Sequence, residues 1–306
     1  MKTVVARPFV KWAGGKGSLL KILESQLPND FDAHDKVTYI EPFVGGGAML
    51  FYMLNTHRNI KRVVINDINQ DLMRCYTLVK ENPQILIMLL KTFEHKYFEL
   101  NEEARKDYFY AVREEYNTDK LDENQRAAYF MFLNHTCFNG LYRENGDGGF
   151  NVPFGRYKHP KICNEALIMT NHTLLSKVKI ICGDYKKVIQ HLSKDYNYIY
   201  LDPPYRPLLG SDNFKHYSKS GFGDPEQEAL KDFCDNLTAR GCQFMLSNSD
   251  STNQDGTSYF EVLYDEYYFD KILAPRFINA YAVKREKQRE VLIKNYNNPQ
   301  KILLNT

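Results

Sequence analysis

The segment that most constrains the fold is a short aromatic and β-branched run that ends in two prolines, Tyr198-Ile199-Tyr200-Leu201-Asp202-Pro203-Pro204-Tyr205. Such a run is typical of a buried strand. Because neither proline has an N–H to donate to a neighbouring strand, the strand must end at Asp202. The turn therefore presents a carboxylate and an aromatic ring at the carboxyl end of a strand, where ligands bind in open α/β sheets. An ordinary exit from strand to loop would have the same sequence, so other segments must decide between the two.

Three further strand candidates are each followed by an acid. Residues 37–40, 63–66 and 178–182 are apolar and β-branched, and Glu41, Asp67 and Asp184 follow them. In a parallel sheet these acids and Asp202 would lie at the same edge. We find no serine elbow, no cluster of metal ligands and no cysteine in an activating setting beside them. Carboxylates, glycine backbone and aromatic rings suit transfer chemistry in which a cofactor carries the reactive group.

A glycine-rich loop follows the first of these strands, in Glu41-Pro42-Phe43-Val44-Gly45-Gly46-Gly47. Strand, glycine loop and helix form the first half of a nucleotide-type unit. Asp67 lies about 20 residues beyond the loop, the separation typical of a carboxylate that binds ribose hydroxyls. Glu41 adds a negative charge that would oppose a pyrophosphate and favour a cofactor with a positively charged centre. An earlier glycine segment contains Trp12 and Lys16, and this lone tryptophan either lines a ligand pocket or belongs to the core.

Residues 70 to about 133 lose the strand signals and show apolar residues at helical spacing, which predicts a helical insertion between two halves of the sheet domain. A hairpin is then expected around the polar, glycine-rich residues 144–149. Apolar wedges and arginines on a protruding hairpin suit a DNA duplex. The alternative is a surface hairpin with ordinary charges. The arms carry Phe138, Leu141, Tyr142, Arg143, Arg156, Tyr157 and Lys158.

The last third of the chain continues the sheet. We expect a helix that begins with Asp224 as its N-cap and ends near Arg240, and a strand from Gln243 to Ser247. The tail from Lys271 to Lys294 is locally basic, as in a solvated surface or a contact with phosphates.

Composition limits the class of protein only weakly. The net charge of +2 does not by itself indicate a nucleic-acid partner. The 6 cysteines contain no Cys-x-x-Cys pair and the 8 histidines form no ligand pattern with them, which predicts free thiols in a reducing compartment and no metal. Neither a signal peptide nor a membrane-spanning stretch is evident. We therefore expect a cytoplasmic protein with no membrane contact.

The motifs taken together resemble a known family. In order along residues 7–295 stand Lys11-Trp12-Ala13-Gly14-Gly15-Lys16, Glu41-Pro42-Phe43-Val44-Gly45-Gly46-Gly47, Asn66-Asp67-Ile68-Asn69, Phe138-Asn139-Gly140-Leu141-Tyr142-Arg143, Asn151-Val152-Pro153-Phe154-Gly155-Arg156-Tyr157 and Asp202-Pro203-Pro204-Tyr205. This set resembles the motifs of Dam-type DNA adenine methyltransferases, and its order is similar to that of their alpha group. Many amino-methyltransferases share Asp-Pro-Pro-Tyr, whereas the combined set is highly specific.

The resemblance implies a fold and an activity. The fold would be α/β, a Rossmann-like S-adenosylmethionine-dependent methyltransferase sheet with helices on both faces. Residues 1–69 and 161–306 would form the catalytic domain, and residues 70–160 an inserted, mostly helical DNA target-recognition domain with a β-hairpin. The enzyme would move a methyl group from S-adenosylmethionine to the N6 amino group of a flipped adenine in double-stranded DNA, in the sequence GATC. We expect a monomer of bacterial or phage origin.

The resemblance also assigns roles to residues. Asp202 and the Pro203 carbonyl would accept the two amino hydrogens of adenine, and Tyr205 would stack on the flipped base. The cofactor would contact Trp12, Lys16, Glu41, Phe43, Gly45, Gly47, Asp67, Asp184 and Asp202. DNA would contact Lys11, Phe138, Asn139, Leu141, Arg143, Pro153 and Tyr157. The hairpin tip departs from the family pattern because it is acidic and lacks a basic residue after Arg143.

Two alternatives stay open at this stage. An amino-methyltransferase that acts on RNA or on protein glutamine can share the Asp-Pro-Pro-Tyr turn, and a panel of substrates would distinguish it. A catalytically silent DNA-binding protein could retain the fold, and a measurement of cofactor binding would reveal it.

Overall fold

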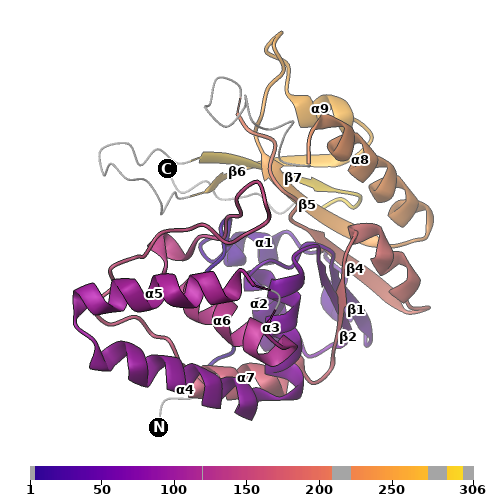
Figure 1. The fold of residues 1–306 in the computed structure, drawn as a ribbon. Coiled ribbons are helices and arrows are strands. Elements are labelled where there is room, and N and C mark those ends of the chain that lie inside the picture. The colour runs from indigo at the N-terminus through magenta and orange to yellow at the C-terminus, as the bar shows by residue number, and fades with distance from the viewer. Residues whose placement is uncertain (1–3, 119, 209–221, 275–287, 299–306) are drawn as a thin grey trace. The chain divides into compact units, whose positions relative to one another are not determined.

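The computed structural model describes residues 4–118, 120–208, 222–274 and 288–298 (Figure 1). They form a mixed α/β fold around a sheet with the strand order β3-β2-β1-β4-β5-β7-β6. The predicted α/β class is confirmed. The strands are β1 (Val37–Glu41), β2 (Ile60–Asp67), β3 (Val178–Cys182), β4 (Tyr196–Leu201), β5 (Gln243–Ser249), β6 (Tyr268–Ala274) and β7 (Gln288–Lys294).

The middle of the sheet is parallel and buried. Strand β1 pairs in parallel with both β2 and β4, and β4 pairs in parallel with β5. Every residue of β1 is buried, as expected for a strand covered on both faces. Because the central strands run the same way, the residues that follow them gather at one edge. The predicted strands at 37–40, 63–66, 178–182, 198–201 and 243–247 are all confirmed.

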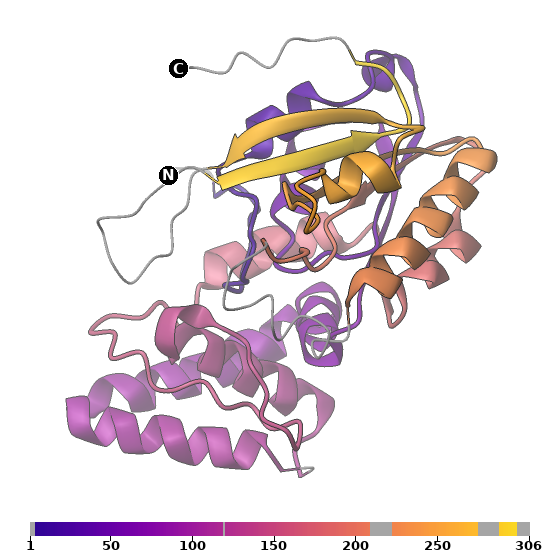
Figure 2. The same ribbon diagram turned by 90° about the horizontal axis from the view of Figure 1, so that it is seen from above.

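The sequence interpretation of the basic tail was incomplete. Two antiparallel strands, β6 and β7, lie there, and β7 also pairs antiparallel with β5. Lys294 is buried rather than solvated, and its ammonium lies 2.6 Å from a carboxylate oxygen of Asp270 and 2.6 Å from Oε1 of Gln26. The remaining tail residues, 275–287, lie outside the described residues. Figure 2 shows β6 and β7 as a long antiparallel pair.

The chain divides into two compact units. The first consists of residues 1–16, 44–58 and 66–184, and the second of residues 17–43, 59–65 and 185–306. The second unit contains the middle of the sheet with α1 (Leu20–Ser25), η1 (Phe31–Ala33), η3 (Tyr185–His191), α8 (Asp224–Ala239) and α9 (Tyr259–Leu263). Helix α8 begins one residue earlier than expected. Its N-cap is Gly223, whose N–H donates to the Glu226 carboxylate at 2.6 Å, so Asp224 already belongs to the first turn.

The first unit is mainly helical, as predicted for residues 70–133. It contains α2 (Ala48–Thr56), α3 (Gln70–Glu81), α4 (Pro83–Glu99), α5 (Glu102–Tyr116), α6 (Glu123–Thr136), η2 (Phe138–Gly140) and α7 (Glu165–Leu175). Proline at the start of α4 and the side-chain caps Asn101 and Asp122 fix where α4, α5 and α6 begin. A buried carboxylate joins three helices: Asp71 of α3 accepts hydrogen bonds from Arg126 of α6 at 2.7 Å and from the Tyr116 hydroxyl of α5 at 2.5 Å.

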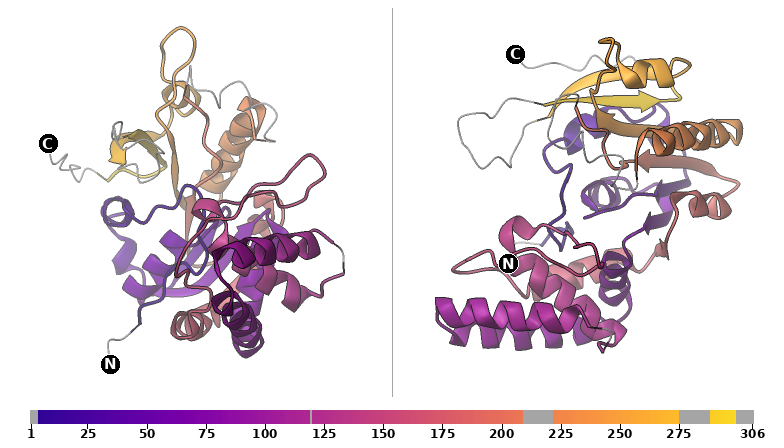
Figure 3. Two further views of the ribbon diagram at one scale, coloured as in Figure 1. Left: turned by 60° about the vertical axis from the view of Figure 1, so that its left-hand side comes forward. Right: turned by 45° about the horizontal axis from the view of Figure 1, so that its top comes forward.

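The predicted hairpin is held by isolated bridges rather than by continuous strands. Cys137 faces Phe154 and Glu144 faces Phe150 in antiparallel bridges. The amide of Asn117, just after α5, pairs with both the N–H and the C=O of Phe150, at 2.9 and 3.1 Å. Figure 3 shows the segment following α6 as a long loop that doubles back beside the helices of this unit.

Candidate active site

The predicted cofactor residues of the first unit gather around the glycine loop. Asp67, at the end of β2, accepts the Gly45 N–H at 3.0 Å on one carboxylate oxygen and the Asn69 N–H at 2.9 Å on the other. Burial raises the pKa of Asp67, and hydrogen bonds from these N–H groups oppose the shift. Trp12 covers the loop so closely that a Cβ on Gly45 would lie 2.9 Å from its ring carbon Cδ1. Gly45 and Gly47 both adopt positive φ, at 49° and 77°, which is why the loop requires glycine.

Two further predicted cofactor residues, Lys16 and Asp184, also belong to this unit. Lys16 is 5% exposed, and its ammonium donates to the Gly14 carbonyl at 2.9 Å, so it closes its own loop. Asp184 is exposed and follows Gly183, whose N–H donates to the Asp67 carbonyl at 3.0 Å. Ile68 was not singled out from the sequence, yet this apolar side chain is 80% exposed directly beside Asp67.

The second unit holds two acids at the ends of β1 and β4, of which Glu41 is buried and Asp202 is half-buried. Glu41 is 2% exposed and accepts a hydrogen bond of 2.5 Å from the Tyr39 hydroxyl. Burial raises the pKa of Glu41 to about 8; the Tyr39 hydrogen bond opposes this shift, and the negative charge of Asp202 adds to it. Glu41 is therefore largely protonated at neutral pH until a positive charge approaches it.

Asp202 is oriented by a residue that sequence reasoning missed. Ser247 of β5 donates its hydroxyl to the Asp202 carboxylate at 2.9 Å. The parallel register of β4 and β5 pairs Leu201 with Leu246, so Ser247 lies opposite the point where β4 ends. Tyr205 donates its hydroxyl to the Glu290 carboxylate of β7 at 2.8 Å. The signal available in the sequence was that Ser247 closes a predicted strand.

The Asp-Pro-Pro-Tyr turn is braced from behind. Gln227 of α8 is fully buried and donates its side-chain N–H to the Pro204 carbonyl at 3.1 Å. Asn248 accepts the Arg206 N–H at 3.1 Å. Phe43, another predicted cofactor residue, packs its ring 5.1 Å from that of Tyr185. The backbone that carries Asp202, Pro203 and Tyr205 is therefore fixed on both sides.

The structure brings the predicted DNA-contacting residues together in the first unit. The Phe138 N–H donates to the Pro153 carbonyl at 2.8 Å, and the Asn139 N–H donates to the Tyr157 hydroxyl oxygen at 3.1 Å. The ammonium of Lys11 lies 4.3 Å from the centre of the Tyr157 ring. Phe138 is 49% exposed, Lys11, Asn139 and Pro153 are exposed, and Leu141 is half-buried beside them.

Arg143 lies farther along the hairpin. It is exposed, and its Nε donates to the Asn151 side-chain oxygen at 2.6 Å, while Nη2 donates to the Asn151 carbonyl at 3.3 Å. Asn151 thereby holds one side of the guanidinium fork. The neighbouring Tyr142 stacks on Trp12 with ring centres 5.7 Å apart, which connects the hairpin to the glycine loop.

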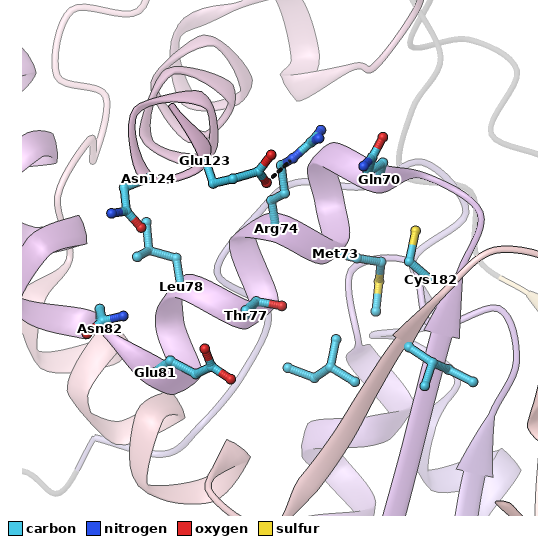
Figure 4. Close-up of a pocket in the computed structure, with 12 residues that line it drawn as sticks. Gln70, Met73, Arg74, Thr77, Leu78, Glu81, Asn82, Glu123, Asn124 and Cys182 are labelled. Atoms are coloured by element: carbon cyan, nitrogen blue, oxygen red, sulfur yellow. Dashed lines mark hydrogen bonds and ion pairs between the residues drawn. The ribbon is translucent and has the colours of Figure 1, made fainter. Parts of the chain in front are cut away.

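A pocket of about 400 Å³ lies elsewhere in the first unit, and none of the predicted site residues lines it (Figure 4). It is bounded by α3, the start of α6 and β3, and Arg74 and Glu123, which both line it, form a 2.5 Å ion pair. Over the described ranges we find no group of three or more His, Cys, Asp or Glu residues that could hold a metal ion. Nor does any described helix have the length and apolar character needed to cross a membrane.

The chain is similar to known proteins over nearly its whole length. Residues 12–277 match the model of the family described as D12 class N6 adenine-specific DNA methyltransferase. The type II methyltransferase M.MjaIII of Methanocaldococcus jannaschii is 44% identical over 95% of this chain and 99% of its own length. M1.LlaDCHI of Lactococcus lactis subsp. cremoris is 36% identical over 95% and 96%, and the DNA adenine methylase of Haemophilus influenzae is 34% identical over 94% and 92%.

These findings confirm the predictions of family, enzyme class, methyltransferase fold and methyl donor. The chain belongs to the D12 class of N6 adenine-specific DNA methyltransferases, enzymes that take their methyl group from S-adenosylmethionine.

Proposed function

We propose that this enzyme methylates the N6 amino group of an adenine flipped out of duplex DNA, within the sequence GATC. The observation that carries the proposal is the Asp202 carboxylate, oriented by Ser247 on a braced Asp-Pro-Pro-Tyr turn. The chain supplies the other requirements as well: a glycine loop capped by a carboxylate, and a hairpin that presents arginine and apolar side chains.

The candidate cofactor residues of each unit, taken separately, have the chemistry that S-adenosylmethionine requires. Asp67 already accepts two backbone N–H groups, and its fixed carboxylate suits ribose hydroxyls. Trp12, which covers the glycine loop, and Ile68, which is exposed next to Asp67, both offer apolar surface for an adenine ring. Glu41 suits the sulfonium, because a cation favours the ionised form of a buried acid. When bound, the cofactor supplies an electrophilic methyl group.

The acceptor nitrogen must be activated by the protein, because the adenine amino lone pair is delocalised into the ring. In the proposed mechanism the Asp202 carboxylate and the Pro203 carbonyl accept its two hydrogens, which draws the nitrogen toward tetrahedral geometry and frees the lone pair. As the new N–C bond formed, the methyl–sulfur bond of the donor would break with its electron pair left on sulfur, and the nitrogen would give one amino proton to the Asp202 carboxylate. Positioning of the base and a preorganised proton acceptor both lower the activation barrier.

The turn also has to hold the flipped base. Extrusion from the stack costs unstacking energy, which an aromatic platform can offset. We assign that platform to Tyr205, whose ring orientation is set by the hydrogen bond of 2.8 Å from its hydroxyl to Glu290. A half-buried ring fixed at its far end can stack without first losing much side-chain freedom.

Recognition of the duplex is assigned to residues 138–157 together with Lys11. Arg143 would read a guanine with its fork, and Lys11 would make a second base contact. Phe138 and Leu141 would act as wedges near the flipped base, with Asn139, Pro153 and Tyr157 as further contacts. Residues 70–160 would then form the target-recognition domain of the enzyme, and Phe43, Gly47, Lys16 and Asp184 would complete the cofactor site.

The substitution Asp202→Asn tests the chemical role directly. It keeps the shape and the Ser247 hydrogen bond but lowers the basicity of the proton acceptor. We expect the methylation rate at saturating cofactor, with saturation checked by calorimetry, to fall by about 10²–10⁴-fold. Full turnover in this variant would refute the assigned role of Asp202.

A further inference from the structure

A buried amide in the first unit holds three separate segments of the chain together. Asn134, near the end of α6, is 2% exposed. Its side-chain oxygen accepts the Lys11 N–H at 2.8 Å, and its side-chain nitrogen donates to the Lys11 carbonyl at 2.8 Å and to the Gly140 carbonyl at 3.0 Å. One side chain thus engages both backbone groups of residue 11 and also the turn at η2.

The turn at Gly140 is shaped to receive the side chain of Lys11. Gly140 has a φ of 61°, and a Cβ built on it would lie 2.5 Å from Cβ and 2.9 Å from Cγ of Lys11. The aliphatic stem of Lys11 therefore lies directly against the glycine backbone. This close approach leaves no space for a side chain at residue 140.

The far end of the Lys11 side chain is held by an aromatic ring. The ammonium lies 4.3 Å from the centre of the Tyr157 ring, a cation–π contact. The Tyr157 hydroxyl oxygen in turn accepts the Asn139 N–H at 3.1 Å. Backbone, stem and head group of an exposed lysine are thus each fixed by a different element. Solvated surface lysines lack this degree of constraint.

We infer that Asn134 is a positioning residue for sequence recognition, which acts by holding Lys11 in place between Gly140 and Tyr157. The inference rests on the proposed function, in which Lys11 contacts a base. A lysine whose side chain is already ordered in the free enzyme loses less conformational freedom when DNA binds. Its ammonium can then reach only one position in the groove of the duplex. Without Asn134, Lys11 would still supply a positive charge to the phosphates but would discriminate less between bases.

The chain contains a matched control for this amide. Asn171 of α7 is also fully buried and clamps the same N-terminal segment in the same way: it accepts the Arg7 N–H at 3.2 Å and donates to the Arg7 carbonyl at 2.9 Å. The substitutions Asn134→Ala and Asn171→Ala therefore remove the same kind of interaction. Only the first removes it next to a proposed base contact.

The experiment measures selectivity, as the ratio of kcat/KM for a GATC duplex to that for duplexes with one changed base. It uses the full enzyme and the variants Asn134→Ala, Lys11→Ala, their double variant and Asn171→Ala. We expect Asn134→Ala and Lys11→Ala each to lower selectivity about tenfold at the same base pair, with no further loss in the double variant. Calorimetric binding of the cofactor should be unchanged in each, and Asn171→Ala should keep wild-type selectivity.

Should Asn134→Ala fail to fold, Asn134→Asp keeps the acceptor for the Lys11 N–H and removes both donated bonds, and the same loss of selectivity is expected. Wild-type selectivity in a folded Asn134 variant, or losses that add in the double variant, would overturn this inference alone. Absence of transfer to any duplex by the wild-type enzyme would overturn the proposed function and this inference together.

Discussion

The substitution Glu41→Gln distinguishes two effects of this buried acid. One is the stability that the cofactor-free protein loses when Glu41 ionises, and the other is the affinity that the Glu41 charge contributes to a cationic cofactor. The folded-state pKa of Glu41 is about 8, against an ordinary value of 4.5. Between these values the folded protein binds more protons than the unfolded chain, so stability falls as pH rises through this window. The contribution of protonated Glu41 to the free energy of unfolding is complete below pH 4.5 and is lost as the pH approaches 8. Because one pKa unit is about 1.4 kcal/mol, the full difference is on the order of 5 kcal/mol as an upper limit.

The glutamine variant carries no charge at any pH, and its amide oxygen can still accept the Tyr39 hydroxyl. We therefore expect Glu41→Gln to raise the Tm of the cofactor-free protein at pH 8, with an advantage that shrinks as the pH falls toward 4.5. Thermal unfolding at several pH values checks this. A pH-independent difference, or a less stable variant at pH 8, would contradict the burial argument.

Glu41→Gln should weaken cofactor binding, although it stabilises the cofactor-free protein. If Glu41 faces the sulfonium, binding must expel its proton, and at pH 7 an acid with a pKa of about 8 gives up about 0.9 proton. As the pH is raised toward 8, the affinity of the wild-type enzyme for the cofactor should increase by up to about tenfold per pH unit. The Glu41→Gln variant should bind the cofactor more weakly and without this pH dependence. Calorimetry in two buffers with different ionisation enthalpies measures the proton release. No release at pH 7 and unchanged affinity in the variant would refute the assignment of Glu41 to the cationic centre.

Two further predictions concern the recognition segment. Arg143→Ala should relax selectivity at one guanine by about 1–3 kcal/mol, measured as relative kcat/KM on duplexes changed at single positions, and an unchanged preference would exclude Arg143 as the reader. Gly140→Ala should lower the free energy of unfolding by about 2 kcal/mol more than Gly148→Ala, because both glycines have positive φ but only Gly140 has Lys11 against it. If chemical denaturation gave the same loss of unfolding free energy for both variants, the contact between Gly140 and Lys11 would not contribute to stability.

The parallel strands could be predicted from sequence because each is a continuous apolar run that ends in a polar residue. Buried strands of this kind have little freedom in their composition. Strands β6 and β7 were missed because their lysines and arginines are typical of a surface. Lys294 is buried only because Asp270 lies nearby in the folded chain, and such a partner cannot be identified from local pattern alone.

The candidate site could be predicted where its residues stand in motifs, and not where they come from elsewhere in the chain. Asp67 and Asp202 follow predicted strands, and the glycine loop is visible in the sequence. Ser247 reaches Asp202 only through the register of β4 and β5. In the sequence Asn134 is one of several polar residues before the predicted hairpin. Its role depends on contacts with residues 11 and 140, which lie in different segments.

The most direct test of the central claim is methyl transfer from labelled S-adenosylmethionine to a set of short duplexes. One duplex contains GATC, a second replaces its adenine, and the others each change one flanking base. The account predicts transfer to the GATC duplex alone, with the label recovered as N6-methyladenine. Transfer to a different adenine site would keep the chemistry and refute the recognition assigned to Arg143 and Lys11. A cofactor-bound enzyme that transfers to none of these duplexes, but does transfer to RNA or to protein glutamine, would contradict the central claim.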